Sequence, residues 1–406
     1  MNNHQLENTL KQELQDIVEN NILNYWMTKM VDEENGGFYG RRDGKDQLIP
    51  DAPKSAILNG RILWAFSAAY RVLGKPEYLD MAQRAKDYIL QHFIDKEYSG
   101  VYWTVDYQGN PLDTKKHGYA MAVILFALAE YVYATDDEEV LQQAKSLFYN
   151  MEGRTADAIN SGYIEAMSRY WLPIKDQRLS SQDESTEHSL NTHLHLLEAY
   201  TCLYRVWPHK VLESRLRRLL GLLLETMVNP ETNHIGLFFS ETWQKGKETR
   251  SYGHSIEAAW MVLDAAKTLG DPILFRYVFE KTQLMAAAAD EGLRPNGGMI
   301  YMSVGEEDGL RHIEDYHWWV QAESILGHWY LYRFMNDDAK FNVVMENFRF
   351  LKDHLIDRKN GEWFWSCDGN GTVNHCDDKA GMWKDPCHNT RMCIKLLEDL
   401  AHERDF

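Results

Sequence analysis

The chain has 406 residues, of which 44% are hydrophobic and 12% aromatic, and its formal net charge at pH 7 is -18. This acidic balance argues against a nucleic-acid partner, because phosphate binding needs basic patches and no run of lysine or arginine exceeds a pair. The length would allow two or three average domains, but barrel folds of this size are often single units. We therefore expect one domain over residues 1–406 and a neutral small-molecule ligand.

The N-terminal thirty residues place Lys11, Glu13, Asp16 and Glu19 among apolar positions. This amphipathic pattern fits neither a signal peptide nor a membrane span, and no later window approaches eighteen uninterrupted apolar residues. The cysteines are odd in number and lack CxxC spacing; they are Cys202, Cys367, Cys376, Cys387 and Cys393. These features predict a reduced, cytoplasmic protein that does not bind a membrane. We expect a monomer, because no unexplained apolar heptad suggests an interface.

A short glycine–aromatic motif recurs six times along the chain, beginning with Gly36-Gly37-Phe38-Tyr39. The motif glycines are residues 37, 100, 162, 236, 298 and 361, which are separated by 63, 62, 74, 62 and 63 residues. Such regular spacing predicts a repeat architecture. Glycine would supply positive φ in the short strands or turns of each repeat.

Each motif is preceded by an amphipathic stretch, such as residues 85–94, and followed by a stretch that is apolar nearly all round, such as 119–132 or 256–266. A helix with one apolar stripe packs on the outside of a fold, whereas one that is apolar on most faces is buried. The pattern predicts an all-α (α/α)6 barrel of six helix-hairpin repeats with short strands or turns between them. The alternative is an open helical solenoid. A count of six repeats favours the closed barrel, because six is the number at which such a barrel closes.

Polar and aromatic residues cluster where each predicted inner helix begins. In chain order they are Asn59, Arg61, His117, Tyr119, Asn191, His193, His195, Glu198, His254, Glu257, Asp315, His317, Trp318, Trp319, Glu323, Trp383, His388 and Arg391. On a closed barrel they would ring one mouth. Burying an unpaired imidazole or carboxylate costs several kcal/mol, so this ring predicts a functional site.

Helical spacing relates some of these residues. Asn191 and His195 are four residues apart and share a helix face, whereas His193 points away from both. His254 and Glu257 are three apart, so we expect the carboxylate to orient the ring. His388 and Arg391 have the same separation, and Asp315, Trp319 and Glu323 would form one stripe.

The histidines differ in their expected roles. We expect His193 and His117 to be hydrogen-bonded core residues, and His317 fits either a core or a ligand role. The buried Arg61 needs an anionic or polar partner, which favours a ligand contact. Trp318, Trp319 and Trp383 lie at the predicted rim, where flat rings suit stacking on sugars.

Five segments resemble the cellobiose 2-epimerases of the N-acylglucosamine 2-epimerase superfamily along the whole chain. They are Asn59-Gly60-Arg61-Ile62-Leu63-Trp64, Asn191-Thr192-His193-Leu194-His195-Leu196-Leu197-Glu198, Gly253-His254-Ser255-Ile256-Glu257-Ala258, His317-Trp318-Trp319-Val320-Gln321-Ala322-Glu323, and Lys379-Ala380-Gly381-Met382-Trp383-Lys384 leading to His388-Asn389. The resemblance implies the same (α/α)6 barrel and a cofactor-independent isomerase. This chain departs from the family pattern at Ser255, Asp385, Cys387 and the stretch around Gly118. Because these positions lie beside the predicted site, the departures bear on substrate preference.

The resemblance implies that His254 and His388 are the acid/base pair, with His195 assisting ring opening. It gives supporting or substrate-binding positions to Arg61, Tyr119, Asn191, Glu257, Trp318, Trp319, Glu323 and Trp383. The expected substrate is a reducing sugar, either a β-1,4-linked disaccharide such as cellobiose, lactose or mannobiose, or a monosaccharide. The expected reaction inverts C2 through a cis-enediolate, since histidine titrates near neutral pH and suits both proton transfers.

Several other functions would use some of the same residues. A monosaccharide or acylglucosamine 2-epimerase and an aldose–ketose isomerase share the enediol chemistry. An inverting glycoside hydrolase would need two carboxylates about 6.5–9.5 Å apart, such as Glu257 and Glu323 or Asp315, and a sugar-binding protein would need only the tryptophans. Zinc bound by His254, Glu257, His195 and His388 is disfavoured by the absence of HExxH and by the nearby Arg61. No GxGxxG, GxxxxGK[ST] or GxSxG motif supports a nucleotide cofactor or a serine hydrolase.

Overall fold

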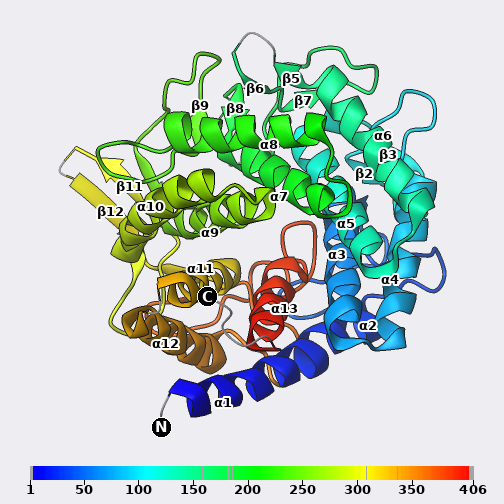
Figure 1. Cartoon of the computed structure of the whole chain (residues 1–406). Coiled ribbons are helices and arrows are strands. Elements are labelled where there is room, and N and C mark those ends of the chain that lie inside the picture. Colours follow the sequence, from blue (N-terminus) through cyan, green and yellow to red (C-terminus); the bar gives the residue numbers. More distant parts are fainter. Residues whose placement is uncertain are drawn as a thin grey trace.

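The computed structural model describes residues 3–157, 160–180, 183–184, 186–307, 309–335 and 337–401. Within them, six inner helices form a closed ring (Figure 1): α3 (Ala56–Leu73), α5 (Gly118–Thr135), α7 (Leu190–Val206), α9 (Tyr252–Leu269), α11 (Trp318–Met335) and α13 (Cys387–Ala401). Each packs against the next, and α13 packs back on α3. The predicted barrel closure is therefore confirmed.

Outer helices surround this ring (Figure 1): α4 (Pro76–Tyr88), α6 (Glu138–Arg154), α8 (Lys210–Leu222), α10 (Pro272–Ala289), α12 (Asp338–His354) and, at the N-terminus, α1 (Asn3–Asp16). Three helices continue as short π-helical turns: α1 as η1 (Ile17–Leu23), α4 as η2 (Ile89–Phe93) and α8 as η3 (Leu223–Met227). Helix α2 (Asn24–Lys29) follows η1. The 3-10 turn η4 (Asp290–Gly292) ends α10. Because α1 packs on α13, the first helix of the chain covers the last.

Helix α5 shows why the inner helices are buried. It is long and apolar enough to cross a membrane by length and composition, yet 83% of it is buried inside the barrel. Its neighbours α3 and α7 cover both of its flanks. A helix that is apolar on nearly every face needs such a surrounding layer, which the outer helices complete.

Short antiparallel strands join neighbouring repeats at the end of the barrel where the inner helices begin. Strand β1 (Lys54–Ser55) pairs with β2 (Thr104–Val105), which pairs with β3 (Pro111–Asp113); β4 (Lys116–His117) pairs with β7 (Ala166–Met167), and β8 (His188–Ser189) with β9 (Phe238–Phe239). Strand β10 (Thr249–Ser251) pairs with β11 (Met302–Glu306), which pairs with β12 (Gly309–Ile313); β13 (Asp315–His317) pairs with β14 (Ser366–Asp368), and β5 (Ala156–Asp157) with β6 (Gly162–Tyr163). The strand before an inner helix thus pairs with the following repeat and fixes where that helix starts.

Side-chain caps fix the same helix starts. Ser55, Ser189 and Ser251 accept hydrogen bonds from backbone N–H groups in the first turns of α3, α7 and α9. Serine at this position satisfies N–H groups that the helix itself leaves unpaired. All three helices therefore begin at one end of the barrel, which becomes its mouth.

The motif glycines are required mainly by close aromatic packing. Gly37 has φ +62, and a Cβ there would lie 2.6 Å from the Tyr88 ring. Gly162 lacks a positive φ, but a Cβ there would lie 2.6 Å from the Trp243 ring. The expectation that every motif glycine supplies positive φ is wrong: residues 37, 100 and 361 do, while 162, 236 and 298 do not.

Candidate active site

The predicted ring of polar residues lies at the mouth, where the inner helices begin. His254 is in the first turn of α9, and His388 is the second residue of α13. Trp319, on the first turn of α11, contacts both imidazoles, with ring centroids 4.8 Å from His254 and 5.7 Å from His388. The two histidines expected to share one proton-transfer task therefore face the same tryptophan.

His388 is held through one of its two ring nitrogens. Its Nδ1 lies 2.7 Å from Glu323 Oε1 and 3.2 Å from an Arg391 guanidinium nitrogen. Among the described residues, no side chain or backbone group hydrogen-bonds to Nε2, which is left for a ligand. Burial lowers the pKa of His388 to about 4, although Glu323 opposes this effect. His388 is thus a neutral imidazole at pH 7, with Nδ1–H donated to Glu323.

His254 is held by Ser251 and Asn191. Its Nδ1 lies 2.7 Å from Ser251 Oγ, and its Nε2 lies 3.1 Å from Asn191 Oδ1. Burial, together with the nearby His195 and His388, lowers the pKa of His254 to about 3. The expectation that Glu257 orients His254 is wrong, because the hydrogen bond of Glu257 goes to Arg391 on α13.

His195 and Arg61 occupy the wall beside this pair. His195 Nδ1 lies 2.9 Å from Glu198 Oε2, and the edge of its ring meets Tyr119 at 4.8 Å. Burial lowers the pKa of His195, against the opposing effect of Glu198. Arg61 donates to Asp385 Oδ2 and to the Tyr119 hydroxyl, both at 2.7 Å. The partner that the buried Arg61 requires is thus a carboxylate within the protein.

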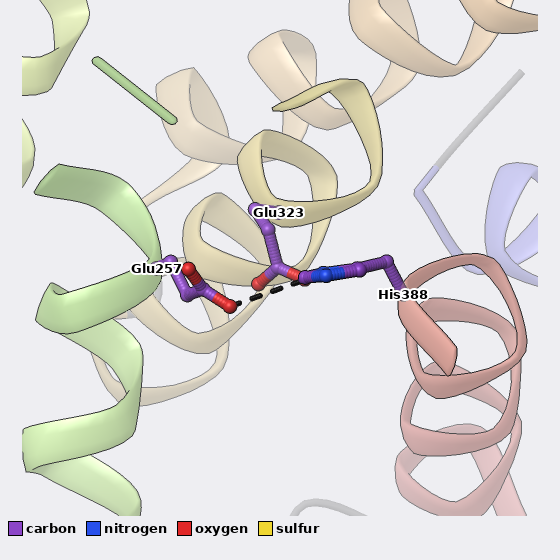
Figure 2. A group of neighbouring side chains, drawn as sticks. All are labelled: Glu257, Glu323 and His388. Atoms are coloured by element: carbon purple, nitrogen blue, oxygen red, sulfur yellow. Dashed lines mark hydrogen bonds and ion pairs between the residues drawn. The ribbon is translucent and has the colours of Figure 1, made fainter. Parts of the chain in front are cut away.

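Glu198, Glu257 and Glu323 form a carboxylate cluster around Arg391, and two of them also lie beside His388. Glu257 on α9, Glu323 on α11 and His388 on α13 point toward one another in Figure 2, and one ligating atom from each lies within 4.8 Å of the other two. Arg391 donates to Glu257 at 3.0 Å and to Glu323 at 2.6 Å, and it also pairs with Glu198. The guanidinium supplies the positive charge that a metal ion would bring, so these donors do not fit a metal site.

Two positions that the resemblance assigns to substrate binding lie below the mouth. Glu323 is 0% exposed, and both of its carboxylate oxygens are hydrogen-bonded, to His388, Arg391 and the Trp260 indole. Trp318 is 1% exposed, and the Lys384 ammonium covers its ring at 4.2 Å. The substrate-binding expectation is wrong for both residues, because protein groups already occupy the surfaces that a sugar would contact.

The remaining aromatic candidates are open to the mouth. Trp319 and Trp383 are half-buried, and Trp383 lies 6.0 Å from Tyr119 and 6.4 Å from Trp103, measured between ring centroids. Their free faces suit stacking on sugar rings. Trp103, the last residue of the second glycine–aromatic motif, was not among the predicted site residues; it is buried and packs near Trp383.

The other histidines at the mouth have structural partners. His193 Nδ1 donates to the Ser189 carbonyl at 2.7 Å, and its Nε2 accepts from Tyr163 N–H at 3.1 Å. His117 is fully buried and caps α5. The core role expected for both is confirmed. His317 pairs with Asp315 at 2.9 Å and stacks on Tyr301; since Asp315 lies on strand β13, the predicted helical stripe with Trp319 and Glu323 does not form.

Sequence reasoning missed specific tasks for Arg391, Ser251 and Asp385. Arg391 was related by spacing to His388, which it contacts, but its links from α13 to α7, α9 and α11 were not predicted. Ser251 carries the ordinary signal of a helix cap. Asp385 drew attention only as a departure from the family pattern, and the structure shows it holding Arg61.

A cavity lies at the other end of the inner helices. It has a volume of about 650 Å³ and is lined by the C-terminal halves of the inner helices, with Glu198 and Arg391 at its floor. Its charged lining is paired internally, as in Arg205 with Asp264 and Arg71 with Glu130. His254, Trp319 and His388 do not line it. The proton-transfer groups therefore belong to the mouth, and the carboxylate cluster separates the two ends.

The chain is similar to known proteins over nearly its whole length. The family model of N-acylglucosamine 2-epimerase (GlcNAc 2-epimerase) matches residues 37–384. The cellobiose 2-epimerase of Bacteroides fragilis is 48% identical over 97% of this chain and 100% of its own length, and that of Ruminococcus albus is 35% identical over 96% and 97%. The solved cellobiose 2-epimerase of Bacillus thermoamylovorans superposes with a TM-score of 0.91 at 36% identity, covering 97% of this chain and 100% of its own. The chain therefore belongs to the N-acylglucosamine 2-epimerase family.

Proposed function

We propose that this chain is an isomerase, a sugar 2-epimerase that interconverts the C2 epimers at the reducing end of a β-1,4-linked disaccharide such as cellobiose. The observation that carries the proposal is a pair of neutral histidines, the half-buried His254 and the buried His388, that both contact Trp319. Near-full-length similarity to enzymes that bear the name cellobiose 2-epimerase supports the substrate class.

The chemistry follows from the acidity of an aldose. The C2 hydrogen becomes acidic only in the open-chain aldehyde, where the carbonyl delocalises the negative charge that its removal leaves. One histidine removes this proton, and the other returns a proton to the opposite face, so the net change is an inverted C2. Each well-placed acid or base contributes on the order of 10²–10⁴-fold to the rate. The lowered pKa values of His254 and His388 keep a neutral base available at pH 7.

The neighbouring residues have complementary tasks. Arg61, fixed by Asp385 and Tyr119, stabilises the enediolate oxygen, because its positive charge lies in a buried site before the reaction begins. His195, with its Nδ1 held by Glu198, assists opening and closing of the sugar ring. Trp319 and Trp383 provide two stacking surfaces, which suit a disaccharide.

The geometry disfavours the hydrolase alternative. An inverting glycosidase separates its carboxyl groups by about 6.5–9.5 Å to admit a water molecule. Here the nearest carboxylate oxygens of Glu257 and Glu323 lie within 4.8 Å, and both carboxylates are bound to Arg391. This pair has neither the separation nor the access that hydrolysis needs.

The test is proton NMR of the purified, EDTA-treated protein with cellobiose, mannobiose, mannose or N-acetylglucosamine in D2O. We expect deuterium at C2 together with the 2-epimer, fastest with a disaccharide. A faster reaction with a monosaccharide would reassign the substrate class, and a ketose product would make the enzyme an aldose–ketose isomerase. Cleavage to monosaccharides would contradict the proposal.

The partner of the protein in this proposal is the sugar alone. The chain acts as a cytoplasmic monomer, with neither a nucleic acid nor a membrane as partner. Size-exclusion chromatography with light scattering measures the oligomeric state, and a dimer would contradict that part of the proposal.

A further inference from the structure

Three glutamates from three different helices converge on a single guanidinium. Arg391 on α13 donates to Glu257 of α9 at 3.0 Å and to Glu323 of α11 at 2.6 Å, and it pairs with Glu198 of α7. All four side chains are at least nine-tenths buried, with exposed fractions between 0% and 8%. The cluster lies directly beneath His388, whose Nδ1 is 2.7 Å from Glu323 and 3.8 Å from Glu257.

The charges of this cluster do not balance when every carboxylate is ionised. Three negative charges against one guanidinium leave two uncompensated charges. The nearby cations are already paired, Arg61 with Asp385 and Lys395 with Asp264. Buried charge without a partner costs several kcal/mol, and two carboxyl groups that share one site do not both ionise easily. One bound proton removes half of the excess charge.

The hydrogen bonds indicate which carboxyl carries that proton. Glu323 accepts from Arg391, from the Trp260 indole N–H and from His388. Glu198 accepts from Arg391 and from His195. Among the described residues, Glu257 has a single hydrogen bond, from Arg391. Because hydrogen bonds to the ionised form favour that form, Glu257 is the carboxyl that is easiest to protonate.

We propose that Glu257 is a neutral carboxylic acid in the working enzyme and is the positioning residue that sets the charge around His388. This inference rests on the proposed function, since it explains how His388 can serve both as base and as acid. A proton on Glu257 leaves His388 neutral and able to accept a proton from C2. Once that proton is on the ring, the ionised Glu323 stabilises the imidazolium, and His388 can return the proton as an acid while Glu257 stays neutral.

The surroundings of Glu257 support this protonation state. The charged and titratable groups that face it are Glu198 from α7, Glu323 from α11, Arg391 and His388 from α13, and the Tyr119 phenol from α5. Burial, followed by the negative charge of Glu323, raises the pKa of Glu257 to about 8, and Arg391 opposes this only in part. Burial opposes ionisation of Glu323 as well, but Arg391 and His388 hold the pKa of that group at about 2.

Glutamine is a close mimic of a protonated glutamate, so Glu257→Gln tests the proposal, with Glu323→Gln as the matched control. We expect Glu257→Gln to keep kcat within about 10-fold of the parent, whereas Glu323→Gln, which removes a required negative charge, loses at least about 100-fold. Activity of the parent should fall above about pH 8 as Glu257 ionises, and this alkaline limb should be absent in Glu257→Gln. A folded Glu257→Gln without turnover, or with an unmoved alkaline limb, overturns the proposal.

A second measurement does not depend on any sugar. In the infrared difference between the free parent enzyme and Glu257→Gln at pH 7, we expect a carboxylic acid C=O band that titrates away above pH 8. A carboxylate band in its place overturns the proposal. Failure of every tested sugar to react would instead contradict the 2-epimerase function and leave this spectroscopic result standing.

Discussion

Arg61 and Asp385 lie 324 residues apart in the chain, yet their side chains form a buried ion pair with a 2.7 Å contact at the barrel mouth. Arg61 belongs to the first inner helix, and Asp385 lies two residues before the start of the last one. The pair therefore bridges the point at which the ring closes, where α13 packs on α3. It also holds the guanidinium that we assign to the enediolate oxygen.

From this pair we predict that Asp385→Asn lowers kcat much more than it raises KM. Without the carboxylate, Arg61 keeps only Tyr119 as an anchor, and a misplaced electrophile can cost about 10²-fold in rate. The matched control is Asp264→Asn, which weakens the half-buried pair with Arg205 at the other end of the barrel. Steady-state kinetics and thermal unfolding should show lost stability in both variants and lost kcat only in the first. Equal kcat in the two variants would reduce Asp385 to a structural role.

The acid/base assignment predicts that His254→Ala and His388→Ala each abolish exchange of the C2 hydrogen with solvent. Each variant removes a group worth about 10²–10⁴-fold. Deuterium incorporation at C2, followed by NMR, measures the step directly. His193→Ala serves as the control, because that buried histidine bonds Ser189 and Tyr163 away from the site. The control should lose stability but retain exchange; full exchange in both His254 and His388 variants would contradict the assignment.

The barrel was predictable from the sequence because its cause is local and repeated. Six glycine–aromatic motifs at nearly constant spacing, each followed by an all-apolar segment, leave few ways to bury those segments other than a closed ring. The polar residues at the start of each apolar segment gave the position of the mouth. The serine caps, such as Ser251 immediately before α9, carry a further signal for the helix starts that was not among the predictions.

Partners from other helices were not predictable from spacing. His254 and Glu257 are three residues apart, which permits a contact along one helix. Arg391 offers Glu257 an ion pair instead, and Ser251 and Asn191 take the two imidazole nitrogens. Trp318 was expected at the rim, but its indole turns inward under Lys384. Sequence spacing shows which residues share one helix face. The packing of the helices against one another determines which residues a side chain actually contacts.

We expect substitution of the two half-buried tryptophans to affect KM and kcat differently. Trp319→Ala and Trp383→Ala should raise KM about fivefold each, since an aromatic stacking contact is worth about 1 kcal/mol. Trp383→Ala should leave exchange at C2 intact in saturating sugar, whereas Trp319→Ala should also lower kcat, because that ring touches both His254 and His388. Trp318→Phe is the control, and its effect should appear in thermal stability. Unchanged KM in both alanine variants would rule out stacking.

Buried neutral histidines make a prediction about stability against pH. His193 donates through Nδ1 and accepts through Nε2, so a protonated ring would turn a donor toward Tyr163 N–H. Burial lowers its pKa to about 3, against an ordinary value of 6.5. Between these values the unfolded chain binds a proton that the folded protein does not, so stability must fall as pH drops below 6.5. Each such histidine contributes up to about 1.4 kcal/mol per pH unit to the slope of the free energy of unfolding against pH.

Urea unfolding from pH 7.5 to pH 5 should therefore show a shallower decline in the free energy of unfolding for His193→Gln than for the parent. Parallel declines would mean that His193 takes up its proton in the folded state.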